Sequence, residues 1–248
     1  MAYGNTYKRH ELKFVLSEQQ YRAVREAISP YMTADEYGRH SILNIYCDSE
    51  NSELIRLSLG KPVYKEKLRL RTYGTATDDG DSFLEIKKKF KGVVYKRRVK
   101  LPYKTAFYYI TSGQLPQSEN FSVKDRQQLA EIDYLMKRLS LKPKIVICYD
   151  RRAFYGNEDS EFRITFDGNI RYRTDNLDLR FGDAGCKALL CQPYCVMEIK
   201  IAAAMPVWMT KILSELHIYK GSFSKYGSIF CEMIKSTNDG GTIGCSLA

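Results

Sequence analysis

Residues 64–73 read YKEKLRLRTY and alternate long cationic side chains with apolar ones. Successive side chains of a β-strand point to opposite faces, so an alternation with a period of two predicts a strand over this stretch. Lys67, Arg69 and Arg71 then share one face of the strand, and Leu70 lies on the other. The stretch therefore predicts a sheet with one apolar face and one strongly basic face.

Other segments with strand character extend this pattern. Strands are predicted over residues 6–16, 41–47, 82–89, 93–101, 144–155, 161–167 and 194–201. Short connections containing Gly74, the turn at residues 78–80 and Gly92 favour antiparallel pairing of these strands. Together with Tyr149 and Thr165, twelve basic and five acidic residues fall on one set of strand faces: Arg9, Glu11, Lys13, Lys67, Arg69, Arg71, Glu85, Lys87, Lys89, Lys96, Arg98, Arg151, Glu161, Arg163, Asp167, Glu198 and Lys200.

Helices are predicted between and after these strands. Ser17 begins the first helix with a capping-box pattern, and Pro30 ends it. The others are predicted over residues 52–59, 102–111, 124–139, 207–217 and 225–235. Because their apolar stripes need apolar surface to pack on, we expect them to cover the apolar strand faces and to leave the charged faces pointing inward. The predicted fold class is α+β: an antiparallel β-barrel of about eight strands with helices packed on the outside.

The chain is expected to form one domain without a membrane segment. That domain covers residues 1–235, and a flexible C-terminal tail rich in Gly and Ser covers residues 236–248. No stretch approaches the roughly 20 apolar residues that a bilayer span needs, and the N-terminus has no apolar signal region. We therefore expect a cytoplasmic protein with no direct membrane insertion.

The seven cysteines include no Cys-x-x-Cys pair, which favours reduced thiols over a disulfide framework. Cys186, Cys191 and Cys195 form the closest cluster, and a metal site there is the less favoured alternative. The sequence also has no Walker-A loop, no kinase-like glycine loop and no Gly-x-Ser-x-Gly motif. Its three histidines are scattered, so catalysis by a Cys or His nucleophile is not expected.

The net charge of +10 points to a polyanionic partner. For any single strand, a charged face wetted by solvent is the plainer explanation. A dozen cations inside a barrel, however, would need a wet interior that holds an anion. A slim, multiply charged anion with a divalent metal, such as a nucleoside triphosphate or polyphosphate, fits that interior. Nucleic acid is not expected as a partner, because it would call for a basic outer patch with exposed stacking aromatics.

Several short motifs on these strands resemble those of the triphosphate tunnel metalloenzymes: Glu11-x-Lys13, Arg69-x-Arg71, Glu85-x-Lys87 and Glu198-x-Lys200. Within that superfamily, three stretches are most similar to the VTC domain, the catalytic module of the vacuolar-transporter-chaperone polyphosphate polymerase: residues 9–14, Tyr149-x-Arg151 and Ser224-Lys225. The resemblance covers residues 6–235. It implies an ATP-dependent polymerase that transfers a terminal phosphoryl group to a growing polyphosphate chain inside an antiparallel triphosphate tunnel.

The resemblance also implies roles for particular side chains. The candidate catalytic residues are Lys13, Arg69, Arg71, Lys87, Arg151 and Glu198. The candidate phosphate-binding residues are Lys13, Arg69, Arg71, Lys87, Lys96, Arg98, Tyr149, Arg151, Arg163, Lys200, Ser224 and Lys225. Glu198 is the expected ligand of a divalent metal, Mn²⁺ or Mg²⁺, with Glu11 and Glu85 as less securely matched acidic sites.

Three functions remain open on the sequence. The first is polymerase activity, with ATP or another triphosphate, inorganic polyphosphate and phosphate as partners. The second is a hydrolase that cleaves triphosphate or polyphosphate with water in the same tunnel, and the third is a module that binds polyphosphate without turnover. All three predict that one lumen receives the same six side chains: Lys13, Arg69, Arg71, Lys87, Arg151 and Lys200.

Overall fold

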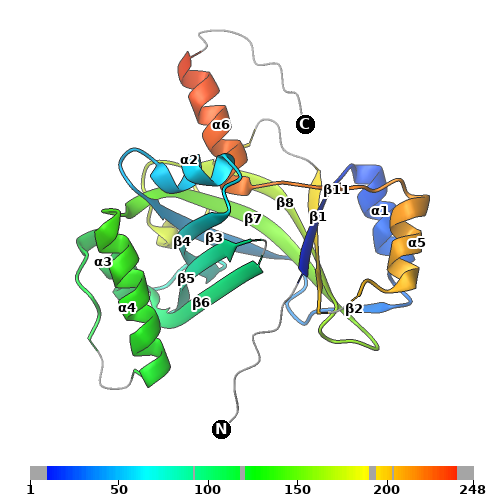
Figure 1. The fold of residues 1–248 in the computed structure, drawn as a ribbon, viewed down its shortest axis with the longest axis horizontal. Helices are drawn as coiled ribbons and strands as arrows, with labels where there is room; N and C mark the ends of the chain where they lie inside the picture. The colour runs from blue at the N-terminus through cyan, green and yellow to red at the C-terminus, as the bar shows by residue number, and fades with distance from the viewer. Residues whose placement is uncertain (1–9, 92, 118–120, 190–193, 203, 239–248) are drawn as a thin grey trace. The chain divides into compact units, whose positions relative to one another are not determined.

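The alternating stretch forms a strand, β4 (Tyr64–Tyr73), with the bounds that its sequence predicts. The computed structural model describes residues 10–91, 93–117, 121–189, 194–202 and 204–238 (Figure 1). The chain forms two compact units. The first unit comprises Met1–His40, Asp150–Asn169 and Cys191–Ser224, and the second comprises Ser41–Tyr149, Ile170–Leu190 and Lys225–Ala248.

The elements divide between the two units. The first unit contains β1 (His10–Leu16), α1 (Glu18–Ala27), β2 (Met32–Ala34), β10 (Cys195–Ile201), α5 (Val207–Glu215) and β11 (Lys220–Gly221). The second contains β4 with β3 (His40–Asp48), α2 (Glu53–Leu59), β5 (Asp81–Phe90), β6 (Val93–Pro102), α3 (Tyr103–Ser112), α4 (Val123–Arg138), the 3₁₀ turn η1 (Leu179–Phe181), β9 (Lys187–Ala188) and α6 (Lys225–Asn238). β7 (Lys142–Gly156) and β8 (Arg163–Arg173) contribute residues to both units, as does β3, whose first residue, His40, belongs to the first unit.

In the first unit, β1 pairs antiparallel with β10 and with the short β11, and β10 pairs antiparallel with β8. The register places Lys13 opposite Glu198, and Lys200 between Glu11 and Arg163. The opposite faces of these strands form an apolar core with α1 and α5. Helix α1 begins as the sequence predicts, because the Ser17 hydroxyl accepts a hydrogen bond from the Gln20 amide at 3.2 Å.

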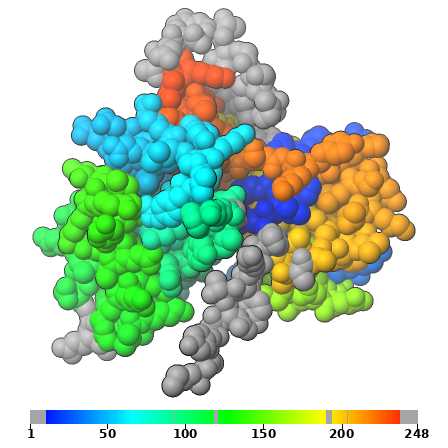
Figure 2. Space-filling model, viewed as in Figure 1, coloured from blue at the N-terminus to red at the C-terminus, as the bar shows by residue number. Residues whose placement is uncertain are grey.

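In the second unit, β3, β4, β5 and β6 form consecutive antiparallel pairs. Leu68, Leu70, Leu84 and Ile86 on β4 and β5 are fully buried and belong to a core shared with residues of α3 and α4. The two helices lie against β5 and β6 (Figure 1). Their outer surfaces, shown in green in Figure 2, face solvent. The apolar strand faces are thus covered by helices, and this confirms the predicted α+β class with antiparallel strands.

The structure adds short elements that the sequence did not predict: β2, β9, β11, η1 and the second half of β8. Strands of two or three residues are too short to show a periodic pattern. β8 continues through Gly168 and Asn169 to Arg173, whereas the predicted strand ends at residue 167, and Gly and Asn are uncommon inside strands. Helix α6 continues to Asn238, three residues into the predicted tail, and residues 239–248 lie outside the described part. The single domain over residues 1–235 stays a prediction.

Candidate functional site

Glu85 lies at the centre of a group of cations in the second unit. The register of β4, β5 and β6 places Arg69 and Arg98 directly beside it. One oxygen, Oε2, accepts a hydrogen bond from Arg69 Nε at 2.7 Å and lies 3.9 Å from Arg71 Nε. The other, Oε1, lies 2.7 Å from Lys96 Nζ and 3.5 Å from Arg98 Nε. Four cations therefore surround one carboxylate whose side chain is 1% exposed.

The electrostatics of this group favour a bound anion. Burial would raise the pKa of Glu85, but Arg69, Arg71 and Lys96 hold it well below its usual range. Burial lowers the pKa of Lys96 to about 8, with the two arginines acting in the same direction and Glu85 against them. One carboxylate cannot neutralise four cations. An anion that binds here would offset the remaining positive charge and raise the pKa of Lys96.

A row of lysines lies on the same strands. Lys87 of β5 is paired with Lys67 of β4 on one side and with Lys96 of β6 on the other. Like charges directly opposite one another destabilise a sheet. Lys87 itself is half-buried. The row therefore adds positive charge on the strands that carry the group around Glu85.

The Arg71 guanidinium is held in one orientation. Its Nε donates to Asn44 Oδ1 at 2.9 Å and its Nη2 donates to the Tyr149 hydroxyl at 3.2 Å. Asn44 in turn donates to the Ile147 carbonyl at 3.1 Å, which fixes the direction of its amide. Lys225 lies with its Nζ 4.3 Å from the centroid of the Tyr149 ring. Three candidate residues, Arg71, Tyr149 and Lys225, are thus brought together.

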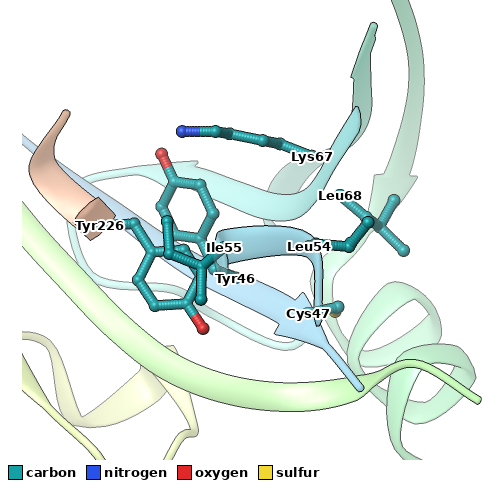
Figure 3. Close-up of a pocket in the computed structure, with 7 residues that line it drawn as sticks. All are labelled: Tyr46, Cys47, Leu54, Ile55, Lys67, Leu68 and Tyr226. Carbon is teal, nitrogen blue, oxygen red and sulfur yellow. The ribbon is translucent and has the colours of Figure 1, made fainter. Parts of the chain in front are cut away.

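Tyr46 belongs to this group although the sequence analysis missed it. It pairs with Arg69 across β3 and β4, and Arg69 Nη1 donates to its hydroxyl at 3.2 Å. Burial would raise the pKa of Tyr46, but Arg69, Lys67 and Arg71 lower it to about 8. Tyr46, Lys67 and Tyr226 border a cavity of about 10 Å³, which has room for about one water and none for a ligand (Figure 3). The signal was available, because Asn44 and Tyr46 alternate with apolar residues in the segment 41–47.

The first unit holds a second charged group, centred on Lys13. Its Nζ lies 3.1 Å from Glu198 Oε1 and 4.0 Å from Glu11 Oε1, and it donates to the Phe223 carbonyl at 3.3 Å. The side chains of Lys13, Glu11 and Glu198 are 30%, 20% and 11% exposed, respectively. Because β1 and β10 are paired in register, the two carboxylates come from neighbouring strands and reach the same ammonium group.

Lys200 lies on the strand that carries Glu198. Burial lowers its pKa to about 8; Arg151 and Arg163 act in the same direction, whereas Glu198 and Glu11 oppose them. A lysine whose pKa is lowered beside two arginines is a group that an anion would stabilise in its charged form.

Arg151 and Arg163 have different surroundings in the first unit. Arg151 forms a bidentate ion pair with Asp167, with Nε and Nη2 at 2.6 and 2.7 Å from the two carboxylate oxygens. Asp167 is 1% exposed, so this pair is a fixed part of the unit. Arg163 lies over the Tyr155 ring, with its Cζ 4.8 Å from the ring centroid.

The carboxylates differ in how well they suit a divalent metal. Mg²⁺ is usually held by one or two carboxylates, with phosphate oxygens and waters supplying the other ligands. Glu198 and Glu11 fit this donor set, since the buried Glu198 and the partly exposed Glu11 both reach one point near Lys13 Nζ. Both oxygens of Glu85 already contact cations, which a metal would have to displace. Within the described ranges, no group of three or more His, Cys, Asp and Glu side chains could hold a metal ion.

The structure thus brings the candidate residues together in two groups. The second unit gathers Arg69, Arg71, Glu85, Lys96, Arg98, Tyr149 and Lys225, with Lys87 in the adjoining lysine row. The first unit gathers Glu11, Lys13, Glu198 and Lys200, near Arg151 and Arg163. Ser224 is half-buried just before α6, and Cys191 lies outside the described residues. That the candidate residues line one lumen stays a prediction.

Comparisons with known proteins agree with this fold. The VTC domain family model matches residues 8–233. The chain is 22% identical over 223 residues to vacuolar transporter chaperone complex subunit 4 of Schizosaccharomyces pombe, an alignment that covers 75% of this chain and 31% of that protein. In the part of the chain that the structure describes, no helix is both long and apolar enough to cross a membrane.

Two solved structures share the fold at low sequence identity. One is a Bacillus halodurans protein assigned as an adenylate cyclase, with a TM-score of 0.53, 13% identity and coverage of 88% of this chain and 95% of that one. The other is a Hippeastrum protein assigned as an adenylyl cyclase and described by a dominant triphosphatase activity. Its TM-score is 0.51, with 13% identity and coverage of 90% of this chain and 95% of that one.

Proposed function

The chain belongs to the VTC domain family, and from that premise we propose that it is an ATP-dependent polyphosphate polymerase. It would transfer the terminal phosphoryl group of ATP or another triphosphate to the end of a polyphosphate chain. The observation that carries the proposal is the group of four cations around the single carboxylate of Glu85. The chain spans about a third of the Schizosaccharomyces pombe relative, so activity of the domain itself is what we propose.

In this proposal, catalysis depends mainly on cationic side chains that are already oriented before substrate binds. Phosphoryl transfer passes through a loose transition state with charge on the equatorial oxygens, so positioning and positive charge can supply most of the rate. Arg69 is oriented by Glu85 and Tyr46, and Arg71 by Asn44 and Tyr149. These arginines can bind phosphate oxygens without the loss of side-chain entropy that reorientation would cost. The attacking oxygen of phosphate or polyphosphate is already ionised at pH 7, so the chain needs no general base.

Glu198 and Glu11 are the proposed ligands of Mn²⁺ or Mg²⁺. When bound, the metal would neutralise phosphate charge and act as a Lewis acid. Lys13, at 3.1 Å from Glu198, would then contact phosphate oxygens next to the carboxylates. Lys200 would hold its proton more firmly once a phosphate lies beside it, because the bound negative charge opposes the effect of burial on its pKa.

A hydrolase is the second candidate. It is favoured by the triphosphatase activity named for the Hippeastrum protein that shares the fold. The same cations would stabilise transfer to water, so the two reactions differ in the acceptor that enters the site. We propose that the chain performs this function in the cytoplasm.

One assay separates these functions. The purified chain is incubated with ATP and Mn²⁺, and the products are resolved on a gel stained for polyphosphate and assayed for orthophosphate. Formation of long polyphosphate supports the polymerase, and release of orthophosphate alone supports the hydrolase. Binding of ATP without any product would show that the protein is a binding module. Arg69→Ala should remove the product, whereas Arg22→Ala, on the exposed face of α1 with a side chain that is 75% exposed, is the matched control and should not.

A further inference from the structure

Two cysteines of the second unit lie side by side outside the candidate site. Cys148 is on β7 and Cys186 comes just before β9, and their sulfur atoms are 3.9 Å apart. Cys148 is fully buried, while Cys186 is partly exposed at the edge of the second unit's core. Both are free thiols in the structure. An oxidant from solvent can therefore react with the partly exposed Cys186, whose sulfur is in contact with the buried sulfur of Cys148.

Arg173 holds the segment that carries Cys186. Tyr172 pairs with Lys187 across β8 and β9, which places the next residue of β8, Arg173, beside Cys186. Arg173 Nη1 donates to Cys186 Sγ at 3.3 Å. Nε, Nη2 and Nη1 of Arg173 also donate at 2.7 Å to the backbone carbonyls of Asn176, Asp178 and Gly182, respectively. A fixed cation therefore lies against one sulfur of the pair.

The two thiols differ in acidity for physical reasons. The hydrogen bond with Cys148 and the contact with Arg173 lower the pKa of Cys186 to about 6, although burial and Asp183 oppose them. Asp183 is partly neutralised, since it pairs with Arg171 at 2.7 Å. The same hydrogen bond and burial raise the pKa of Cys148. The partly exposed sulfur thus carries thiolate character, which is the reactive form of cysteine, and the buried one keeps its proton.

We propose that Cys148 and Cys186 are a modification site at which hydrogen peroxide forms a disulfide within the chain. The Cys186 thiolate attacks one oxygen of the peroxide; the S–O bond forms, the O–O bond breaks, and the departing hydroxide becomes water by taking a proton from solvent. Cys148 sulfur then attacks the sulfenic acid on Cys186. The S–S bond forms, the S–O bond breaks, and hydroxide leaves with the Cys148 proton as a second water. Two thiols lose two electrons, and one peroxide is reduced to two waters.

Formation of the disulfide requires the two sulfur atoms to move closer together. The sulfurs start 3.9 Å apart and must close by about 2 Å to reach a disulfide bond length of about 2.05 Å. Rotation of the Cys186 side chain and a shift of the segment before β9 can supply that approach. Cys148 sits next to Tyr149, so the disulfide would fasten this segment to β7 beside a residue of the cationic group.

Peptide mapping tests the proposal on the whole chain. Reduced protein is treated with hydrogen peroxide at low protein concentration, blocked with iodoacetamide and digested with trypsin without reductant. We expect a disulfide-linked pair of peptides, residues 145–151 and residues 181–187, that disappears on reduction. Intact protein should lose the mass of two hydrogens. Recovery of both cysteines as alkylated thiols, or a disulfide between two chains, would overturn the proposal.

Serine variants assign the two roles. Cys148→Ser should stop at the sulfenic acid, which dimedone would label on the peptide of residues 181–187. Cys186→Ser should leave Cys148 as a thiol under the same treatment. Cys231→Ser removes an exposed cysteine of α6 and is the matched control, which should form the linked peptides as the unmodified protein does. Labelling of Cys148 rather than Cys186 would contradict the assignment. If a variant fails to fold, the mapping of unmodified protein still decides the proposal.

Discussion

Arg71 is fixed by neutral partners, and this makes it a clean probe of phosphate binding. Its hydrogen-bond partners Asn44 and Tyr149 are uncharged, and the carboxylate of Glu85 lies 3.9 Å from its Nε. A hydrogen bond to a charged group is worth about 1.5–3 kcal/mol, so Arg71→Ala should lower kcat/KM for triphosphate about 10- to 100-fold. KM should rise and kcat should fall, because a phosphate clamp acts before and during transfer. Steady-state kinetics beside Arg22→Ala check this, and an unchanged kcat/KM would exclude Arg71 from the site.

Glu198→Gln separates metal binding from substrate binding. The amide keeps the size of the side chain but removes the negative charge that lies 3.1 Å from Lys13 Nζ. We expect metal-dependent turnover to fall by about 100-fold or more, since a bound metal supplies several kcal/mol of charge stabilisation. Triphosphate binding measured by calorimetry without metal should persist or strengthen, because the site becomes more positive. A folded variant with normal turnover would remove Glu198 from the proposed metal site.

Tyr46 predicts a pH dependence of stability. Its pKa is about 8 in the folded chain, below the ordinary value of 10.0, so the stabilisation is complete above about pH 10 and is lost as pH falls through 8. The free energy of unfolding of the natural chain should therefore rise relative to Tyr46→Phe between pH 8 and 10, by on the order of 2 kcal/mol. Urea denaturation at pH 7, 8, 9 and 10 measures the difference. A constant difference across this range would contradict the prediction.

The charged residues of the site were predictable, but their partners were not. The alternation along β4 indicated that Arg69 and Arg71 share one face of the strand, and this prediction does not depend on how the strand pairs with others. That Glu85 lies beside Arg69 depends on the register between β4 and β5, which no single strand encodes. For the same reason the sequence left Glu85 as a metal candidate, and it overlooked Tyr46, whose significance comes from the cations on the next strand.

At the scale of the element, the first turn of α1 offers a stability test. The Ser17 hydroxyl accepts from the Gln20 amide, and the Gln20 side chain accepts from the Ser17 amide at 3.1 Å. Ser17→Ala should lower the free energy of unfolding by about 1 kcal/mol. Because the two hydrogen bonds form one box, Ser17→Ala with Gln20→Ala should cost less than the sum of the single changes. Chemical denaturation of the three variants checks both statements, and strict additivity would argue against a coupled box.

Elements with their own periodic pattern were predicted well, as the matching bounds of β4 and the cap of α1 show. The elements that were missed have no such pattern. β2 is three residues long and β11 is two residues long. Each forms a strand by hydrogen bonding to a longer strand, β2 to β7 and β11 to β1. Their formation is decided by tertiary structure, which a local pattern cannot report.

At the scale of the whole molecule, the positive charge predicts stabilisation by polyanions. A ligand that binds only the folded chain adds about 2.7 kcal/mol at one hundred times its Kd. Tripolyphosphate should therefore raise Tm by several degrees, and more so at low ionic strength, where surface charges are screened less. Sulfate at the same ionic strength is the control for general charge effects. Equal shifts with the two anions would show that the chain has no built phosphate site.

The division of the chain also has a consequence for how it is made. Each unit is assembled from three separated segments, so neither corresponds to a continuous stretch of the gene product. β1 is synthesised before its partner β10, which ends at Ile201, and the second unit lacks α6 until the chain has been synthesised to Asn238. Contacts between residues so distant in sequence slow folding. During translation, the apolar face of β1 therefore stays uncovered by β10 until more than 180 further residues have been synthesised, and apolar surface exposed in this way is prone to aggregation.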